Sequence, residues 1–336
     1  MIDAIVVAKD GALARLRGIR LVTVPLPSPD PHRALDALDR AVACARLGVP
    51  DRPLVLVAPD DFRVATTSMR SDLRIRLDLV LMSEHAEEGL DALLVSGALD
   101  ALLPDVKALV GFGDGEWRHK DVWKHTKQVV RQAEGRLEVR WAALLHDIGK
   151  VRTRSISPDG EVHFFGHAEV GARMFDKMER RTPLFVDETP LRDSVRFLIL
   201  HHLRAAGYDE SWTDSAVRRF GKEMGPHLDA LLCLARADIT TKRPEKKRRG
   251  LRQIDDLFDR LKKIQDEDAV PATFPKGLGT GLMSELAIPP SPRVGQIMRA
   301  LEGAIASGEI PGQQEIGFYV DFVRANAARF GLLAGR

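Results

Sequence analysis

Apolar side chains recur every three or four residues along most of this chain of 336 residues, and that spacing predicts a mainly α-helical protein. One run contains Leu90, Leu93 and Leu94. Comparable runs follow one another from about residue 70 to Phe330. We therefore expect the bulk of the molecule to be helical.

The first 60 residues have a mixed pattern. A helix is expected over 31–47, with Asp30 available as its N-cap and Gly48 beyond its end. Short runs rich in β-branched residues surround this helix and predict strands over 2–7, 19–26 and 53–59. This part of the chain is therefore expected to be a small α/β segment.

Two interruptions divide the helical pattern. The turn sequence Ser157–Gly160, flanked by Ile156 and Val162, predicts a small hairpin or ordered loop over 153–165. A second break, rich in proline, glycine and charge, covers 266–280. We expect it to separate a final helical module.

Composition excludes several classes of protein. The 50 Lys and Arg residues balance 48 Asp and Glu residues, and the formal net charge of +2 excludes a globally basic nucleic-acid coat protein but leaves local basic patches open. Two cysteines cannot make a disulfide framework or a cysteine-based zinc site. Because the chain has neither a long apolar run nor a secretory signal pattern, no membrane span is expected and the predicted location is cytoplasmic.

Histidines and aspartates fall on the apolar faces of several expected helices. His125, the doublet His146–Asp147 and Asp238 follow apolar neighbours at helical spacing, so these groups should point inward. A carboxylate that faces a core is costly unless it is paired, hydrogen-bonded or bound to a cation. Imidazole nitrogens and carboxylate oxygens from four helices would meet that need as metal ligands. An ordinary core or surface imidazole is the alternative for each histidine taken alone.

These residues resemble a known family. The ordered set resembles the ligands of the HD superfamily of metal-dependent phosphohydrolases and consists of His125, His146, Asp147, His167, His202 and Asp238. The sequence segments around them are similar to the HD region of bacterial CCA-adding tRNA nucleotidyltransferases, as in Ala143–Lys150 (ALLHDIGK) and Gly166–Ala172 (GHAEVGA). Gly279–Leu286 is similar to that family's C-terminal helical body.

The resemblance implies an HD-domain helical bundle with helical flanking modules and a small α/β N-terminal segment. The expected domains are an N-terminal segment of unclear role over 1–70, a helical neck-like region over 71–110, the HD domain over 111–265 and a C-terminal body-like module over 266–336. The glycine-rich turn and closely spaced aspartate pair of that family's polymerase head have no counterpart before residue 70. Any polymerising activity would then come from a separate nucleotidyltransferase subunit.

The resemblance also implies one or two divalent ions as cofactors. One ion would be held by His125, His146, Asp147 and Asp238, and the other by Asp147, His167 and His202. Adjacent helical residues point about 100° apart, and the resemblance selects His202 over His201, which stays a candidate for an additional ligand. The ligand types leave the metal open among Mn, Ni, Co, Fe, Zn and Mg.

Basic residues provide candidate contacts for substrate. Lys150 lies one turn beyond His146 and could bind a phosphate, or it could simply meet the dipole at a helix end. Arg204 and Lys120 are weaker candidates of the same kind. A dense basic run begins four residues after Asp238 and contains Lys242, Arg243, Lys246, Lys247, Arg248 and Arg249. This run favours electrostatic, salt-sensitive binding of RNA or a nucleotide over a merely solvated helix face.

The first functional hypothesis is a metal-dependent phosphohydrolase in which Asp147 and Lys150 are catalytic. It would act on nucleotides or RNA 3′ ends, as a phosphatase or 2′,3′-cyclic phosphodiesterase, through a metal-activated hydroxide. The second is an RNA-binding remnant of a CCA-adding enzyme, which grips tRNA and has a non-catalytic HD site. The third is a di-iron HD oxygenase. The oligomeric state stays open.

Overall fold

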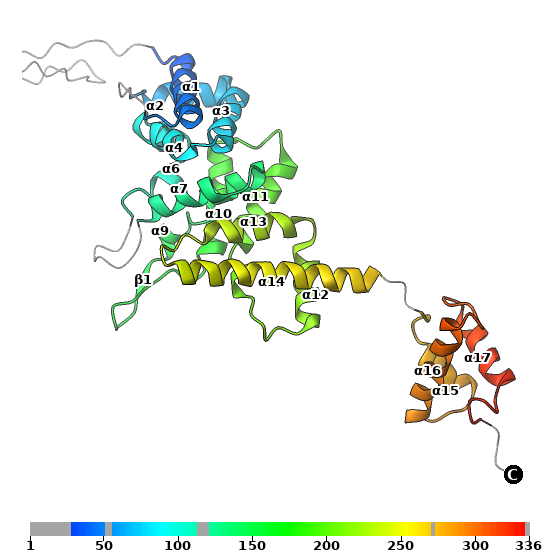
Figure 1. Cartoon of the computed structure of the whole chain (residues 1–336). Coiled ribbons are helices and arrows are strands. Elements are labelled where there is room, and N and C mark those ends of the chain that lie inside the picture. Colours follow the sequence, from blue (N-terminus) through cyan, green and yellow to red (C-terminus); the bar gives the residue numbers. More distant parts are fainter. Residues whose placement is uncertain (1–27, 51–55, 113–120, 270–272, 333–336) are drawn as a thin grey trace, which may run out of the picture. The chain divides into compact units, whose positions relative to one another are not determined.

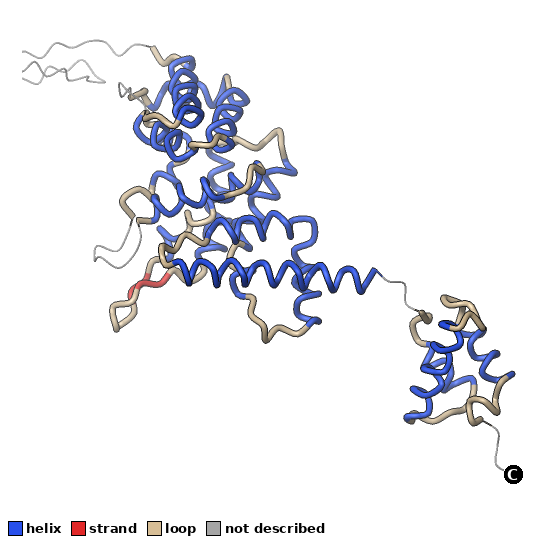
Figure 2. Tube along the Cα trace, viewed as in Figure 1, coloured by secondary structure: helices blue, strands red, loops and turns tan. Residues whose placement is uncertain are grey.

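The computed structural model describes residues 28–50, 56–112, 121–269 and 273–332 (Figure 1). Within these ranges nearly all regular structure is helical, and the two strands that occur there pair with each other (Figure 2). The prediction of a mainly helical protein is therefore confirmed. The chain divides into two compact units, residues 1–261 and residues 262–336.

The first unit begins with a group of short helices. They are α1 (Pro31–Leu47), α2 (Pro59–Ser68), α3 (Arg70–Met82), α4 (Ala86–Val95), α5 (Ala98–Leu102) and α6 (Pro104–Lys107). Helix α1 has the predicted limits, because the Asp30 side chain accepts a hydrogen bond from the backbone N–H of His32 and Gly48 ends the helix at a φ of 66°. The strands expected over 2–7 and 19–26 lie outside the described residues. Residues 56–58 form no strand, and Pro59 begins α2.

The HD region follows in the same unit, except that its last helix continues past residue 261. Its elements are α7 (Val122–Gln132), α8 (Leu137–Leu145), α9 (Lys150–Thr153), β1 (Ser155–Ile156), β2 (Val162–His163), α10 (His167–Arg181), α11 (Thr189–His201), α12 (Asp214–Met224), α13 (Leu228–Asp238) and α14 (Pro244–Ala269). Helix α8 is buried along nearly its whole length and packs against α7, α11 and α13. The predicted hairpin is present, with Ile156 paired to Val162 in an antiparallel ladder.

The second interruption begins later than predicted. Helix α14 continues to Ala269, so residues 266–269 are helical, whereas the sequence pattern placed them in the break. The preceding residues 260–265 (RLKKIQ) are mostly arginine, leucine, lysine and glutamine, which have high helix propensity, and this explains why the polar sequence does not end the helix. Helix α15 (Leu278–Glu285) then starts the next helical group.

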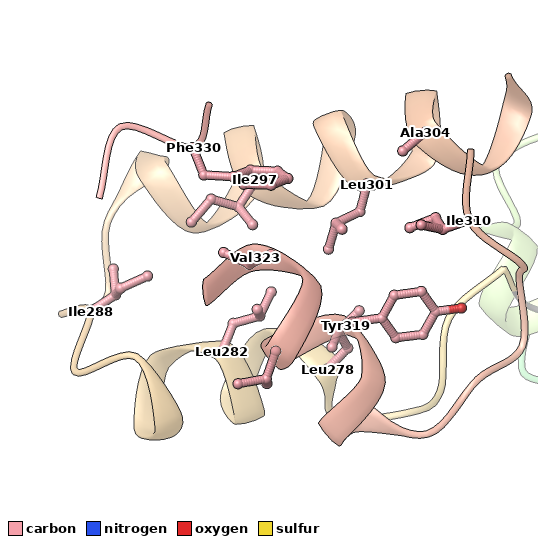
Figure 3. Packing of buried hydrophobic residues seen from close by; sticks show 11 residues of the cluster. Leu278, Leu282, Ile288, Ile297, Leu301, Ala304, Ile310, Tyr319, Val323 and Phe330 are labelled. Atoms are coloured by element: carbon pink, nitrogen blue, oxygen red, sulfur yellow. The ribbon is translucent and has the colours of Figure 1, made fainter. Parts of the chain in front are cut away.

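The second unit has a small core of its own. Helix α15 packs with α16 (Pro292–Ala306) and α17 (Ile316–Ala325) around Leu282, Leu301 and Val323 (Figure 3). Tyr319 is fully buried, and its hydroxyl oxygen accepts a hydrogen bond of 3.1 Å from the backbone N–H of Gln314. These contacts satisfy the polar end of an otherwise apolar core residue.

A buried polar link joins α3 to α8. Asp78 accepts hydrogen bonds from Arg74 Nε at 2.7 Å and from Trp141 Nε1 at 2.6 Å. The Arg74 guanidinium also lies over the Phe185 ring, 4.1 Å from its centroid. Since Arg74 and Trp141 are buried, this carboxylate holds the short N-terminal helices against the HD region.

No helix among the described residues is long and apolar enough to cross a lipid bilayer.

Replacing Asp78 with alanine is expected to lower the free energy of unfolding by about 2–4 kcal/mol, because Trp141 Nε1–H and Arg74 lose a shared buried acceptor. Urea denaturation measures this loss. Asp72→Ala on the same helix is the matched control, since its exposed carboxylate lies 3.5 Å from Arg76 and should contribute little. Equal destabilisation by the two substitutions would contradict the role assigned to Asp78.

Candidate metal centre

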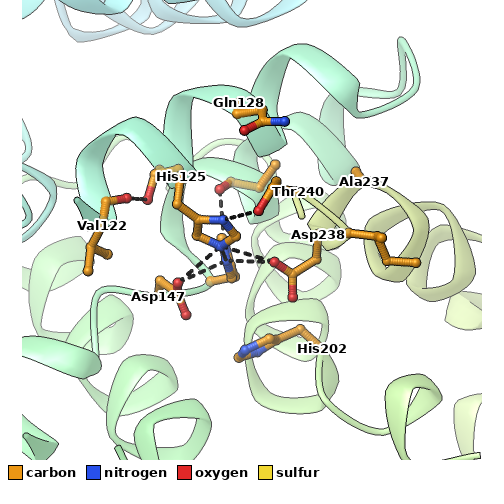
Figure 4. Close-up of polar contacts among 12 residues, drawn as sticks. Val122, His125, Gln128, Asp147, His202, Ala237, Asp238 and Thr240 are labelled. Atoms are coloured by element: carbon orange, nitrogen blue, oxygen red, sulfur yellow. Dashed lines mark hydrogen bonds and ion pairs between the residues drawn. The ribbon is translucent and has the colours of Figure 1, made fainter. Parts of the chain in front are cut away.

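Six predicted ligand residues converge at one place in the first unit. His125 comes from α7, and His146 and Asp147 follow the end of α8. The other three lie at helix ends as well, with His167 at the start of α10, His202 just after α11 and Asp238 at the end of α13. Figure 4 shows His125, Asp147, His202 and Asp238 facing a common centre. The structure therefore brings the whole set together.

Asp147 stands at the middle of the cluster. Its Oδ2 lies 3.2 Å from His146 Nε2 and 3.4 Å from His125 Nε2, whereas its Oδ1 lies 3.5 Å from His167 Nε2. The donor atoms form two groups that could each hold an ion, and Asp147 belongs to both: one contains His125 and His146, the other His167 and His202. Its two oxygens thus serve different groups.

Asp238 completes the first group. Its Oδ1 lies 3.0 Å from His125 Nε2 and 3.7 Å from His146 Nε2 (Figure 4). Its side chain is 30% exposed, whereas that of Asp147 is 1% exposed. Asp238 therefore forms the open edge of an otherwise buried cluster.

Backbone carbonyls orient three of the four imidazoles in the same way. The Nδ1 of His146, His167 and His202 lies 2.8–2.9 Å from the carbonyl oxygen three residues earlier in the chain. A carbonyl oxygen only accepts, so in each neutral ring Nδ1 carries the hydrogen and Nε2 keeps its lone pair. This hydrogen bond fixes both the tautomer and the direction of the ring.

Two pairs of ring nitrogens meet inside the cluster. His167 Nε2 lies 3.1 Å from His202 Nε2, and His146 Nε2 lies 3.4 Å from His125 Nε2. Neither His167 nor His202 has a proton to donate to the other, because each already donates Nδ1–H to a carbonyl. The facing lone pairs of His167 and His202 therefore favour a cation bound between them.

For the His167 and His202 pair, burial argues against a proton as that cation. It lowers the pKa of His167, and it lowers the pKa of His202 to about 4, with the nearby charge of His146 acting in the same direction. Both rings are therefore neutral at pH 7 and available as metal ligands.

His125 and the two carboxylates respond differently. Burial lowers the pKa of His125, but hydrogen bonds to Asp147 and Asp238 outweigh it and raise the value to about 9. Burial raises the pKa of Asp147, yet the neighbouring His146, a hydrogen bond from His125 and the charge of Lys150 hold it well below its usual value. The pKa of Asp238 is lowered to about 2 despite burial, chiefly by its hydrogen bond to His125. Without metal, His125 therefore keeps a proton that a metal ion would displace.

The donor set fits divalent metal. Two donors that each lie about 2.1 Å from one ion, at 90–109° to each other, are about 3.0–3.4 Å apart. Most of the donor separations in the cluster lie close to this range. Imidazole nitrogen with carboxylate oxygen suits several first-row metals, and the geometry does not choose among them.

Lys150 lies beside the cluster. Its Nζ contacts Asp147 Oδ2 at 2.6 Å and lies 5.7 Å from the centroid of the Phe164 ring. The side chain is 21% exposed, so the ammonium group can be reached from outside the cluster. This position next to Asp147 is compatible with the predicted contact to a phosphate.

Among the described residues, the candidates for an additional ligand and for further phosphate contacts are not found in the cluster. The His201 ring packs against Phe197 in a tilted arrangement with a centroid distance of 4.3 Å, while its neighbour His202 enters the cluster. Arg204 pairs with Glu223 at 2.7 Å. Lys120 is outside the described residues.

Two positions that the sequence did not single out support the cluster. A Cβ atom on Gly149 would lie 2.0 Å from the His167 carbonyl oxygen and 2.7 Å from the Gly171 backbone nitrogen. The segment after Asp147 therefore packs directly on the first turn of α10. Thr240 Oγ1 lies 2.9 Å from His125 Nδ1 and orients that ring. The sequence feature that could have identified Gly149 is a glycine two positions after the His146–Asp147 doublet.

The basic run occupies the start of α14 and the segment before it. Lys246 and Arg249 line a cavity that Asp238 also lines. Arg248 pairs with Glu245, one turn earlier on the same helix. The run therefore does not act as one uniform surface.

Gly149→Ala is expected to destabilise the protein by about 1–3 kcal/mol or more and to lower its metal content, because the added methyl group forces α10 and His167 away from Asp147. Thermal unfolding and elemental analysis measure the two effects. Gly207→Ala is the control, since no atom lies within 4 Å of its added Cβ. Unchanged stability and metal content of Gly149→Ala would contradict this packing argument.

The apparent affinity for a divalent ion is expected to rise by about tenfold per pH unit between pH 6 and about 9, because binding must displace one proton from His125. The sign follows from the raised pKa, since the ring is protonated below 9 and a ligand nitrogen must be neutral. Calorimetry of the metal-free protein in buffers of different ionisation enthalpy counts the released proton. A pH-independent affinity would contradict this expectation.

Comparisons with known proteins agree with the geometry. Residues 122–242 match the HD domain family. The chain is 33% identical over 258 residues to an A-adding tRNA nucleotidyltransferase from Deinococcus radiodurans, which covers 74% of this chain and 57% of that protein. It is 30% identical over 312 residues to a CC-adding tRNA nucleotidyltransferase from Thermus thermophilus, which covers 90% of this chain and 64% of that protein.

A multifunctional CCA protein from Azoarcus is 36% identical over 113 residues, or 32% of this chain and 26% of that protein. The chain thus spans less than two thirds of the length of each of these relatives. Its matched residues contain all six members of the histidine and aspartate cluster. The chain therefore carries an HD domain, the fold of a metal-dependent phosphohydrolase superfamily, and it resembles the HD and C-terminal helical regions of CCA-adding tRNA nucleotidyltransferases.

Proposed function

We propose that this protein is a metal-dependent phosphohydrolase that acts on a nucleotide or an RNA 3′ end. The observation that carries this proposal is the buried cluster in which unprotonated imidazole nitrogens face one another at 3.1 Å beside the Asp147 carboxylate. The HD domain over residues 122–242 supports the reaction class. The relatives named as tRNA nucleotidyltransferases support an RNA or nucleotide substrate.

The residues would divide the work as follows. His125, His146 and Asp238 would hold one divalent ion, His167 and His202 a second, and Asp147 would contact both. A bound divalent ion supplies a Lewis acid, which lowers the pKa of water and neutralises negative charge on a phosphoryl group. Lys150, already 2.6 Å from Asp147 Oδ2, would bind a phosphoryl oxygen at the edge of the cluster.

The reaction is a simple hydrolysis. The water oxygen forms a bond to phosphorus, and one P–O ester bond breaks. The leaving oxygen receives a proton, so a 2′,3′-cyclic phosphate would open to a phosphomonoester and a monoester would release inorganic phosphate. The chain's own side chains position the phosphate and the ions, and none of them forms a covalent intermediate.

Binding of tRNA without hydrolysis is the second candidate, and the names of the relatives favour it. In that case the α14 surface would bind RNA while the HD cluster served stability. Filter binding with Asp147→Ala separates the two functions. RNA affinity that survives this substitution in a protein without phosphohydrolase activity would favour the binding function.

Asp147→Ala is expected to reduce phosphate release from nucleotides and from 2′,3′-cyclic phosphates by more than about a hundredfold, because the one carboxylate common to both donor groups is lost. Activity is measured with Mn, Ni, Co, Fe, Zn or Mg added to the metal-stripped protein. Asp193→Ala, which removes an exposed carboxylate from α11, is the control. A wild-type protein inert with every metal, or one that holds two irons and consumes oxygen, would overturn the proposal.

A further inference from the structure

A cavity adjoins the open edge of the metal cluster. It has a volume of about 320 Å³, near the lower end of the usual range for ligand pockets, which is roughly 300–1,000 Å³. Asp238 and Thr240 form one wall, and both contact His125, at 3.0 and 2.9 Å. Lys246 and Arg249 of α14 line the same cavity. The cavity therefore connects the ligands of the cluster with two positive charges.

Helix periodicity explains which basic residues reach the cavity. Lys246, Arg249, Gly250 and Gln253 all line it, and their spacing of three, four and seven residues places them on one face of α14. Lys247 and Arg248 fall between them in sequence, so their side chains leave the helix in other directions. Of the basic residues at the start of α14, Lys246 and Arg249 therefore face the cavity, whereas Lys247 and Arg248 do not.

The neighbours of this face hold it in position. Gly250 packs against Ile239, since a Cβ atom on it would lie 3.2 Å from the Ile239 Cδ1 atom. Gln253 Nε2 donates a hydrogen bond of 3.2 Å to the backbone carbonyl of Ala206. The first contact holds α14 against the segment that directly follows Asp238, and the second holds it against the turn at Ala205–Gly207. The backbone of this face is therefore fixed by packing.

The two cavity cations are available for a ligand. Among the residues that the structure describes, neither Lys246 nor Arg249 lies within 4.0 Å of a carboxylate oxygen. Other members of the basic region are engaged, as Arg236 pairs with Asp255 and Arg248 with Glu245. Two unpaired cations on one wall of a small cavity favour an anion, and phosphate chemistry suits both an ammonium and a guanidinium group.

We propose that Lys246 and Arg249 bind a second phosphate of the substrate while the reacting phosphate lies at the metal cluster. This inference rests on the proposed function and narrows its substrate class. The preferred substrate carries a phosphate on the 5′ side of the nucleotide whose 2′ or 3′ phosphate reacts. An RNA 3′ end and a nucleoside bisphosphate both meet this requirement, whereas a nucleotide with only the reacting phosphate does not.

The decisive comparison uses two substrates that differ in one group. Adenosine 2′,3′-cyclic phosphate and its 5′-phosphorylated form share the base, ribose and reacting phosphate. We expect the wild-type protein to prefer the 5′-phosphorylated form by about tenfold or more in kcat/KM, because two charge-assisted contacts are added. The dinucleotide ApA with a 2′,3′-cyclic phosphate tests whether the second phosphate can come from RNA. It presents an internucleotide diester in place of the terminal 5′-phosphate of a nucleoside bisphosphate.

Matched double variants locate the effect. Lys246→Ala/Arg249→Ala should reduce the preference to less than about threefold, whereas Lys247→Ala/Arg248→Ala removes two charges from the same turn and should retain most of it. Equal losses in the two variants would assign the effect to the general positive field of α14 and overturn the cavity proposal. A wild-type protein that hydrolyses both substrates at equal rates would overturn it as well.

A binding measurement distinguishes failure of this inference from failure of the proposed function. Calorimetry with the metal-free protein compares adenosine 3′,5′-bisphosphate with adenosine 3′-phosphate. Tighter binding of the bisphosphate that depends on Lys246 and Arg249 supports the second phosphate position even in a protein without hydrolytic activity. Equal affinities, or no binding of either nucleotide, overturn it.

Discussion

The HD region depends on a cluster of buried hydrogen-bond acceptors at its centre. Three imidazoles donate Nδ1–H to backbone carbonyls, so their Nε2 lone pairs face inward, where they meet one another and the buried Asp147 carboxylate. Such a group of acceptors is unfavourable in the absence of a cation. The same arrangement offers donor atoms to a divalent ion, so we expect binding of metal and stability of the fold to be linked.

The rest of the first unit supplies the rigidity that this arrangement requires. Ligands lie at helix ends, where a side chain can turn back to the carbonyl three residues earlier. Gly149 allows the segment after Asp147 to pack directly on α10, and Thr240 orients His125 from the segment after α13. Asp78 joins the N-terminal helices to α8, which leads into His146. Packing far from the ligands therefore determines their positions.

The edge of the cluster determines how a substrate would approach. Asp147 is buried, whereas Asp238 is partly exposed and faces the cavity that Lys246 and Arg249 line. Negative ligands on one side and positive side chains on the other polarise this cavity, and bound metal would make the whole site attractive to phosphate. A hydrolase of nucleotides or RNA ends and a phosphate position beyond the reacting group are consistent with one another in this geometry.

Much of the fold was predictable because its causes are local. Helix α1 and the hairpin follow from apolar spacing, from the cap at Asp30 and from the turn at Ser157–Gly160. The six residues of the candidate metal centre were also identified together, through the resemblance around His146, and the structure places them close to one another. The late end of α14 was not, because a polar sequence with high helix propensity was interpreted as a linker.

The sequence by itself determined the helical character, the ligand types and the presence of a basic run, since these depend on residue identity and short spacing. Only the tertiary structure decided that the two oxygens of Asp147 serve different histidine groups, that Gly149 contacts His167, and that Lys246 and Arg249 share a cavity with Asp238. These features join residues that are far apart in the chain, and packing of the helices, which no local pattern encodes, sets their distances.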